Sequence, residues 1–204
     1  MDGLVAAARA TGVADERVLA AIAAVPRADF VPPEYAGQAD ADMPIPIPHQ
    51  QVTTQPSLVA RMVEALALAG DERVLEIGTG YGWQTALLAS LAREVFSVER
   101  FAELAETARA ALAERANVVV LVGDGSEGLA DHAPFDAIVV AAAYPSVPAP
   151  LVQQLVEGGR LVQPLGPGGD EDVVLFEKHR QALQQVRTIS GAHFVRLHGR
   201  HGFA

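Results

Sequence analysis

Three closely spaced glycines, Gly78, Gly80 and Gly82, follow the apolar run RVLEI and precede a helical pattern. Glycines at such a strand–helix junction permit a tight turn and a close approach of the backbone to a ligand. The dinucleotide-binding fingerprint would place a further glycine at position 83, where Trp83 stands, and a P-loop would need a lysine, which is missing. The loop therefore predicts a small-molecule site whose ligand carries no phosphate group.

Acidic residues stand at the ends of three successive predicted strands, beside and beyond this glycine loop. The carboxylate of Glu76 would repel a pyrophosphate and attract a cation, such as an ammonium or sulfonium group. Glu99 follows about twenty residues later, where an acid accepts hydrogen bonds from ribose hydroxyls. Asp124, in the GDG motif, could accept a hydrogen bond from an adenine amino group. A cation, a ribose and an adenine without a phosphate together predict S-adenosylmethionine as the cofactor.

The expected cofactor contacts come from the glycine loop and from the residues at the three strand ends. They are Glu76, Gly78, Thr79, Gly80, Gly82, Gln84, Glu99, Arg100, Asp124 and Gly125. Taken singly, each motif also has a purely structural reading: the glycines as a junction, Glu99 as a solvated strand end and Asp124 as a turn residue. Their occurrence in this order favours the cofactor site.

The elements that must position these residues follow from the apolar periodicity of the chain. Helical spacing predicts helices over residues 1–25 and 56–69, with a proline-broken connector and a loop between them. From residue 73 to residue 166, runs rich in Val and Ile alternate with helical segments, which is typical of βαβ units and a parallel sheet buried on both faces. Two final strands, over residues 173–179 and 183–197, have the pattern of a β-hairpin.

We therefore predict an α/β fold: a Rossmann-like S-adenosylmethionine-dependent methyltransferase with a doubly wound, mostly parallel sheet and an N-terminal helical extension. Its last helix is expected over residues 149–157. We expect a single domain over residues 1–204. In it, residues 1–70 supply the N-terminal helices and a substrate loop, and residues 71–204 supply the cofactor-binding sheet core and the C-terminal strands.

The composition narrows the class of protein further. Of the 204 residues 50% are hydrophobic, which predicts a folded globular chain, and the net charge of −10 argues against a nucleic-acid partner. The chain has no cysteine, so disulfides, thiolate catalysis and zinc–cysteine sites are excluded. No signal peptide is evident, and no apolar run approaches the roughly 20 residues of a membrane span. We expect a cytoplasmic monomer with no membrane partner and no metal.

Several kinds of methyltransferase are disfavoured by missing residues. The segment after the fourth strand, VVAAAYPSVPAP, lacks the (Asn/Asp)-Pro-Pro-(Tyr/Phe) tetrad of amino methyltransferases, and cytosine-C5 enzymes need a cysteine nucleophile. No His/Asp cluster of the kind that catechol methylation would require stands near the predicted sheet edge.

A set of ordered motifs resembles the protein-L-isoaspartate (D-aspartate) O-methyltransferase family, from about Val18 to Gly202. They read VPRADFVP, PIPIPHQQVTTQPSLVARMVEAL, VLEIGTGYGWQTALLA, VGDGSEG, FDAIVVAAA, LVEGGRLVQPLG and FVRLHGRHG. The resemblance implies a Rossmann-like sheet with a C-terminal variation in strand order. It also implies methyl transfer from S-adenosylmethionine to the α-carboxyl of L-isoaspartyl or D-aspartyl residues in damaged proteins. The ester would then collapse to a succinimide, which initiates repair.

The resemblance assigns the chemistry to the loop that contains QQVTTQP. Thr54 stands at the position of the family's serine, so it is expected to be the catalytic residue, and threonine keeps the hydroxyl donor. His49, Gln51, Val52 and Thr53 are expected to complete the substrate loop. The loop departs from the family where Pro48-His49-Gln50 replaces a glycine-containing turn. Thr54 could instead be an N-cap of the following helix, and His49 a plain loop residue.

The acceptor chemistry explains why the sequence shows no catalytic triad. A carboxylate with a pKa of about 4 is already an anion at neutral pH, so it needs positioning and exclusion of water rather than a general base.

Two rival functions stay open: a peptide-tailoring aspartate O-methyltransferase with one dedicated precursor peptide, and a non-catalytic S-adenosylmethionine-binding module. Arg196, which replaces a family proline, could pair with a peptide carboxylate or be solvated. The HGRH segment could bind a metal or form a mobile tail.

Overall fold

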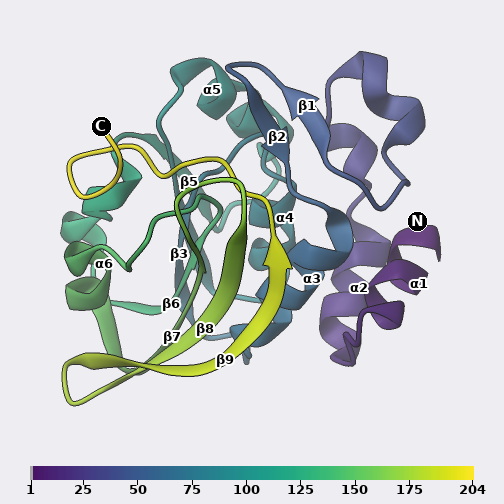
Figure 1. Ribbon diagram of the computed structural model, residues 1–204. Coiled ribbons are helices and arrows are strands. Elements are labelled where there is room, and N and C mark those ends of the chain that lie inside the picture. Colours follow the sequence, from purple (N-terminus) through teal and green to yellow (C-terminus); the bar gives the residue numbers. More distant parts are fainter. Residues whose placement is uncertain (1) are drawn as a thin grey trace.

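The computed structural model describes residues 2–204, and these form a mixed seven-stranded sheet with helices on both faces (Figure 1). The spatial order of the strands is β5-β4-β3-β6-β7-β8-β9. The first five are parallel, and β8 and β9 are antiparallel additions at one edge. The strands are β3 (Arg73–Ile77), β4 (Glu94–Glu99), β5 (Val118–Val122), β6 (Phe135–Val140), β7 (Leu155–Leu165), β8 (Glu171–His179) and β9 (Ala182–Ala192). The predicted mostly parallel sheet is confirmed.

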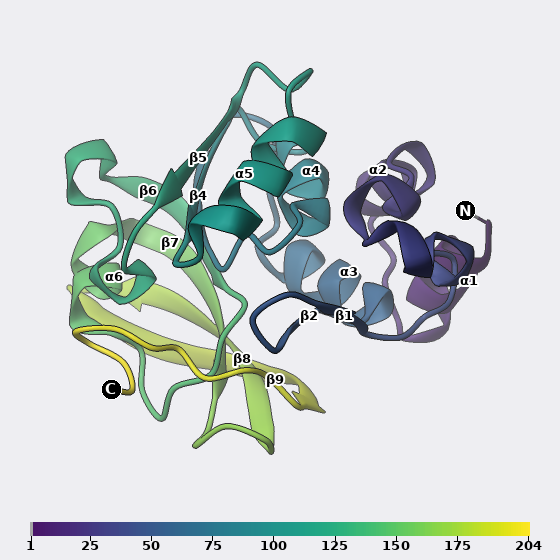
Figure 2. The same cartoon turned by 90° about the horizontal axis from the view of Figure 1, so that it is seen from above.

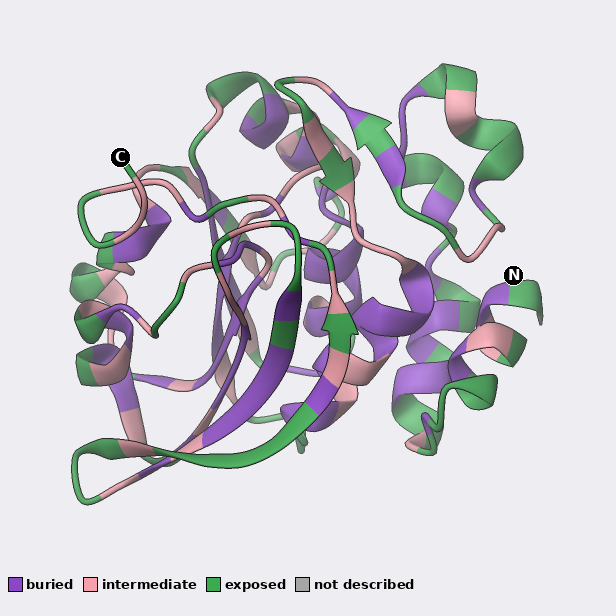
Figure 3. Cartoon of the chain, in the orientation of Figure 1, coloured by how far each residue is buried: buried purple, intermediate pink, exposed green. Residues whose placement is uncertain are grey.

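Alternating side chains along the central strands bury both faces of the sheet. Val74 of β3 packs with the helices α3 (Pro56–Ala65), α4 (Trp83–Ala89) and α5 (Ala102–Ala111). Its neighbour Leu75 packs with α6 (Ala149–Gln154) on the opposite face. Because successive side chains of a strand point to opposite faces, an unbroken apolar run is what a doubly covered strand requires. The predicted doubly wound arrangement is confirmed, and Figure 3 shows the buried strands at its centre.

The N-terminal extension consists of two helices instead of the one predicted over residues 1–25; Met1 lies outside the described residues. These are α1 (Asp2–Ala10) and α2 (Glu16–Ala24). The chain turns at Gly12, whose φ of +96° ends the first helix, and Asp15 caps the second by accepting a hydrogen bond from the Arg17 N–H. Both helices belong to the same apolar cluster as α3 and α4, so they form part of the main core.

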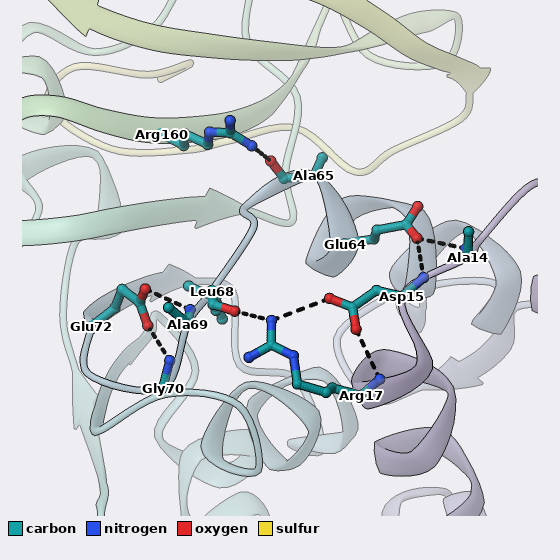
Figure 4. Close-up of polar contacts among 10 residues, drawn as sticks. All are labelled: Ala14, Asp15, Arg17, Glu64, Ala65, Leu68, Ala69, Gly70, Glu72 and Arg160. Atoms are coloured by element: carbon teal, nitrogen blue, oxygen red, sulfur yellow. Dashed lines mark hydrogen bonds and ion pairs between the residues drawn. The ribbon is translucent and has the colours of Figure 1, made fainter.

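Glu64 of α3 fastens this turn to the rest of the protein (Figure 4). Its Oε1 accepts hydrogen bonds from the backbone N–H groups of Ala14 and Asp15, at 2.6 and 2.7 Å. The helix α3 ends at Ala65, earlier than predicted, and Arg160 of β7 donates to the carbonyl of Ala65 at 3.2 Å. The N-terminal helices, α3 and the sheet are therefore joined by polar contacts as well as by the core.

The segment between the N-terminal helices and α3 contains short elements that the sequence did not predict. Two 3₁₀ turns, η1 (Arg27–Phe30) and η2 (Pro33–Gln38), lead into a small antiparallel hairpin of β1 (Ile45–Ile47) and β2 (Gln51–Thr53). This hairpin pairs only with itself. Figure 2, seen from above, shows it between the N-terminal helices and the C-terminal strands.

The C-terminal part differs from prediction at two boundaries. Residues 155–157, expected in the last helix, already belong to β7. The strand β9 ends at Ala192 instead of continuing to residue 197, and the chain then returns beside Ala143, which forms an isolated bridge with Arg196. Among residues 2–204, no helix is long and apolar enough to cross a lipid bilayer.

Candidate active site

A cavity opens at the carboxyl edge of the parallel strands, where ligands bind in open α/β sheets. The glycine loop between β3 and α4 lines one side, together with Glu99 at the end of β4 and Gly125 after β5. The hairpin strand β2 and residues 195–198 line the other side. The topology thus brings the predicted cofactor loop and the predicted substrate loop to one cavity.

The glycine loop adopts the backbone that its sequence predicts. Gly78, Gly80 and Gly82 have φ values of +93°, +55° and +95°, in the left-handed region that favours glycine. A Cβ on Gly78 would lie 3.3 Å from the Cβ of Ala141, and one on Gly82 would lie 2.9 Å from Leu112. Side chains at these positions would therefore be both strained and crowded, and the turn leaves its backbone exposed to the cavity.

Glu99 is the acidic residue that faces this cavity. Only 5% of its surface is exposed, and its two oxygens accept hydrogen bonds from the backbone N–H groups of Gly80 and Phe101, each at 3.0 Å. A carboxylate oxygen can accept two hydrogen bonds, so each oxygen retains an acceptor site for a further donor. The paired hydroxyls of a ribose match this arrangement.

Glu76, in contrast to the prediction, does not line the cavity. It is completely buried behind the glycine loop. Its carboxylate accepts hydrogen bonds from Gln84 at 2.9 Å, Thr85 at 2.5 Å and Ser97 at 2.6 Å. Burial raises the pKa of Glu76 to about 7, although the three donors oppose this shift. The residue ties β3, β4 and α4 together beneath the loop and does not offer its charge to a ligand.

Asp124 is also absent from the lining of the cavity, again in contrast to the prediction. Its carboxylate accepts hydrogen bonds from the backbone N–H and the hydroxyl of Ser126, at 2.9 and 2.6 Å. A third bond comes from the backbone N–H of Arg200, at 2.6 Å. Gly199 approaches so closely that a Cβ there would lie 2.0 Å from Asp124 Oδ1. Ser126 and the C-terminal turn thus take three of the roughly four acceptor sites of the carboxylate that was expected to meet adenine.

That turn is a packed part of the molecule rather than a mobile tail. Arg200 pairs with Glu127 at 3.2 Å, and the ring of Phe203 packs edge-on against Tyr144. Arg196 stacks over the Phe203 ring and donates from Nε to the carbonyl of Pro167, at 3.0 Å. Within the described part of the chain, no group of three or more metal-ligating side chains could hold a metal ion.

Thr54 lines the same cavity as the glycine loop and Glu99. The structure does not make it a helix cap: Gln55 occupies the N-cap position of α3, and Asp42 accepts the hydrogen bond from the Ser57 N–H at 2.8 Å. Among the described residues, the Thr54 hydroxyl has no hydrogen-bond partner. It is therefore available to a ligand.

The other residues of the predicted substrate loop divide into two groups. Gln51, Val52 and Thr53 line the cavity. His49 does not: it stands at the hairpin tip, where its ring stacks on Phe101 at 4.3 Å, and its Nε2 lies 3.1 Å from Glu103. This tip is clasped to the start of α5, so His49 positions the loop and does not meet the substrate in this arrangement.

Arg27, which sequence reasoning missed, anchors the hairpin from beneath. It is 1% exposed and donates to the carbonyls of Ala41 at 3.1 Å and Met43 at 2.9 Å, and to the Thr53 hydroxyl at 2.7 Å. Burial lowers its pKa to about 10, while the charge of Asp42 opposes the shift. An arginine after a proline gave no sequence signal for this role, because its partners lie 12 to 27 positions away.

The donor set fits S-adenosylmethionine. Glu99 suits the ribose, and the glycine backbone permits close approach. Phe30, Tyr81 and Trp83 line the same cavity with aromatic rings, which attract a cation such as a sulfonium. Of the other predicted contacts, Thr79, Gln84, Arg100 and Gly125 line the cavity as well.

The fold and the site place this chain in the class of S-adenosylmethionine-dependent methyltransferases. Residues 1–202 match the family described as protein-L-isoaspartate(D-aspartate) O-methyltransferase (PCMT), and the chain belongs to this family. It is 48% identical over 198 residues to the protein-L-isoaspartate O-methyltransferase of Koribacter versatilis, covering 96% of this chain and 89% of the relative. The corresponding protein of Myxococcus xanthus is 50% identical over 193 residues, covering 92% and 91%.

Solved structures agree with this membership. A protein-L-isoaspartate O-methyltransferase matches with a TM-score of 0.85 and 27% identity, covering 98% of this chain and 67% of that chain. A Plasmodium falciparum structure, named as a candidate member of the same family and solved with S-adenosyl-L-homocysteine, has a TM-score of 0.79 and 96% coverage of both chains. At 20% identity the second likeness concerns the fold. The predicted family is confirmed.

Proposed function

We propose that this protein transfers a methyl group from S-adenosylmethionine to altered aspartyl residues in damaged proteins, which initiates their repair through a succinimide. The acceptor is the α-carboxyl of an L-isoaspartyl residue or the side-chain carboxyl of a D-aspartyl residue. The family and its named relatives support the reaction. The observation that carries the proposal is the Thr54 hydroxyl, which has no partner among the described residues and faces the cavity that Glu99 and the glycine loop line.

The residues of the chain orient the acceptor rather than activate it. S-adenosylmethionine supplies an electrophilic methyl group when bound. The acceptor carboxylate is already ionised at neutral pH, so Thr54 donates a hydrogen bond to one of its oxygens and leaves the other directed along the line of transfer. Arg27 and Thr53 hold the loop that carries this hydroxyl. Good orientation of this kind can lower a reaction barrier by about 7–11 kcal/mol.

We further propose that the enzyme is a monomer and acts in the cytoplasm. The Thr54 and Glu99 side chains that line the cavity both come from one chain, which supports a monomer. Sedimentation equilibrium of the purified protein tests this oligomeric state, and we expect the mass of one chain, 21.4 kDa.

A single assay tests the reaction against its rivals. A generic isoaspartyl peptide and its normal aspartyl twin are each offered with S-adenosylmethionine that carries a labelled methyl group. We expect label in the isoaspartyl peptide only. Label in the aspartyl twin would favour the peptide-tailoring enzyme, which the altered Pro48-His49-Gln50 tip supports. Label in neither peptide, with cofactor still bound, would favour the non-catalytic module and refute the proposal.

A further inference from the structure

A second cavity adjoins the first on the far side of Thr54. It has a volume of about 300 Å³ and lies between α3, the hairpin and the end of β9, elements that Figure 1 shows side by side. Val52, Thr54, Ala141 and Val195 line both cavities. Thr54 therefore stands where the two spaces meet, and the second cavity is the adjoining space into which a bound polypeptide can extend.

The second cavity has a charge opposite to that of the whole protein. The described residues that line it include no aspartate or glutamate, although the chain carries a net charge of −10. Arg61 and His193 are its ionisable residues, and the other polar ones are neutral. Such a local excess of positive charge on an acidic protein favours an anionic ligand.

Arg61 supplies the permanent charge of this cavity. It lies on α3 and is half-buried. Its Nη2 donates to the carbonyl of Ile189 in β9, and the side chain has no ion-pair partner among the described residues. A guanidinium has five N–H donors in a planar fork, so this single contact fixes its position and leaves donors for a carboxylate.

Asp42 and Glu171 each bind the backbone of a residue that lines this cavity, and both have donors of their own. Asp42 accepts hydrogen bonds from Gln55 Nε2 at 2.9 Å and from the Ser57 N–H at 2.8 Å. Glu171 accepts them from the N–H groups of Asp170 at 3.0 Å and Phe194 at 2.7 Å. Neither lines the cavity, so the charge of Arg61 is not neutralised from within the site.

We propose that the second cavity binds the residues that flank the target of methylation, and that Arg61 selects an acidic side chain there. The inference rests on the proposed function, because a polypeptide whose carboxyl reaches Thr54 must extend into an adjoining space. Its chemistry is a carboxylate that meets a half-buried guanidinium. Arg61 is thus a specificity-determining residue for this reaction.

The test compares isoaspartyl peptides that differ only in one flanking side chain. Glu, Gln or Lys is placed two residues before or two residues after the isoaspartyl residue, and kcat/KM is measured for each peptide. On one of the two flanks we expect Glu to be preferred over Gln by about three- to tenfold at low salt, the range for exposed to partly buried charge pairs. The preference should shrink as the ionic strength rises.

Variants identify the residue responsible. Arg61→Gln should bring the Glu/Gln ratio close to one, and Arg61→Glu should turn the preference towards Lys. Arg93→Gln is the matched control, because it removes the same charge at an exposed position before β4, at the opposite edge of the sheet. It should keep the natural ratio. Each ratio compares two peptides on one protein, so partial loss of folded enzyme does not alter it.

The outcomes separate this inference from the proposed function. Methylation of the Gln peptides without a preference for Glu on either flank would overturn the inference and leave the function standing. A preference for Glu that survives both Arg61 variants would overturn it as well. If no isoaspartyl peptide is methylated at all, the proposed function fails and the inference fails with it.

Discussion

Position, more than residue type, decides which polar side chains can act in this molecule. Glu76 and Glu99 lie at or next to the ends of neighbouring strands, and the sequence predicts both as cofactor contacts, the first for the sulfonium and the second for the ribose. The structure buries the first among three donors and leaves the second facing the cavity. Likewise Thr53 and Thr54 are adjacent, yet the first is bound by Arg27 and the second has no partner among the described residues.

Replacing Thr54 by valine should lower kcat and leave cofactor binding nearly unchanged. Valine has a similar shape but no hydroxyl, so the acceptor carboxylate loses a charge-assisted hydrogen bond of about 1.5–3 kcal/mol, which corresponds to roughly 10- to 100-fold in rate. Steady-state kinetics and calorimetric titration with S-adenosylhomocysteine measure the two effects. Thr54→Ser is the control and should retain most activity. An equal loss of cofactor affinity in Thr54→Val would show that the residue is structural.

Replacing Glu99 by glutamine should instead weaken cofactor binding. The amide keeps one acceptor oxygen but loses the charge and the second acceptor oxygen. Fewer acceptor sites then remain for the ribose hydroxyls and for the N–H groups of Gly80 and Phe101. We expect the dissociation constant to rise by about tenfold or more. Equilibrium titration checks this. Glu94→Gln, at the opposite end of the same strand, serves as the control, and an equal affinity in both variants would contradict the role of Glu99.

At the scale of elements, the substrate hairpin depends on a few side chains that reach it from outside. Arg27 binds its two ends from beneath, and His49 attaches its tip to Phe101 and Glu103. The hairpin shares no strand pairing with the main sheet. Its position relative to the cofactor loop is therefore set by these contacts and by apolar packing.

Replacing Arg27 by methionine should destabilise the hairpin more than the sheet. The change leaves the carbonyls of Ala41 and Met43 without their donor in a partly buried site, and each unsatisfied group costs up to about 1–3 kcal/mol. Hydrogen exchange measured by mass spectrometry should show faster exchange in residues 39–54 and little change in the central strands. Arg27→Lys, which keeps a charge but fewer donors, should give an intermediate result. Uniform acceleration across the chain would contradict this local role.

The sequence predicted elements well where one periodicity dominates. The parallel strands and the helices between them follow from Val- and Ile-rich runs separated by helical segments, and both apolar clusters contain them. The break at Gly12 was missed because the apolar spacing continues across it. The hairpin was missed because Pro46 and Pro48 are residues that strands rarely contain. Nothing local to Asp124 shows that residues 199–201 fold back beside it, so the sequence could not predict these contacts.

At the scale of the whole molecule, Glu76 links stability to pH. Burial raises its pKa from 4.5 to about 7 in the folded protein. Between these values the folded chain retains a proton that the unfolded chain has released, so the free energy of unfolding falls as the pH rises from 4.5 to about 7. The contribution of protonated Glu76 to the free energy of unfolding is greatest below pH 4.5 and is lost above about pH 7.

Comparison with Glu76→Gln isolates this group from the others that titrate. Glutamine has no proton to lose, so this titration does not lower the stability of the variant. The free energy of unfolding of the natural protein should therefore fall relative to that of Glu76→Gln as the pH rises from 4.5 to about 7. Chemical denaturation at pH 4.5, 6 and 7.5 gives the difference in free energy of unfolding at each pH. A difference that stays constant would mean that the pKa of Glu76 lies outside the window.

The independence of the hairpin has a consequence for how this family can diversify. In the proposed reaction the sheet edge holds the methyl donor, whereas the acceptor is held by a two-stranded appendage whose hydrogen-bond ladder is its own. Substitutions in residues 44–55 leave the ladder of the main sheet intact. Substitutions there can thus alter the choice of acceptor without altering the donor site, and the Pro48-His49-Gln50 tip lies within this stretch.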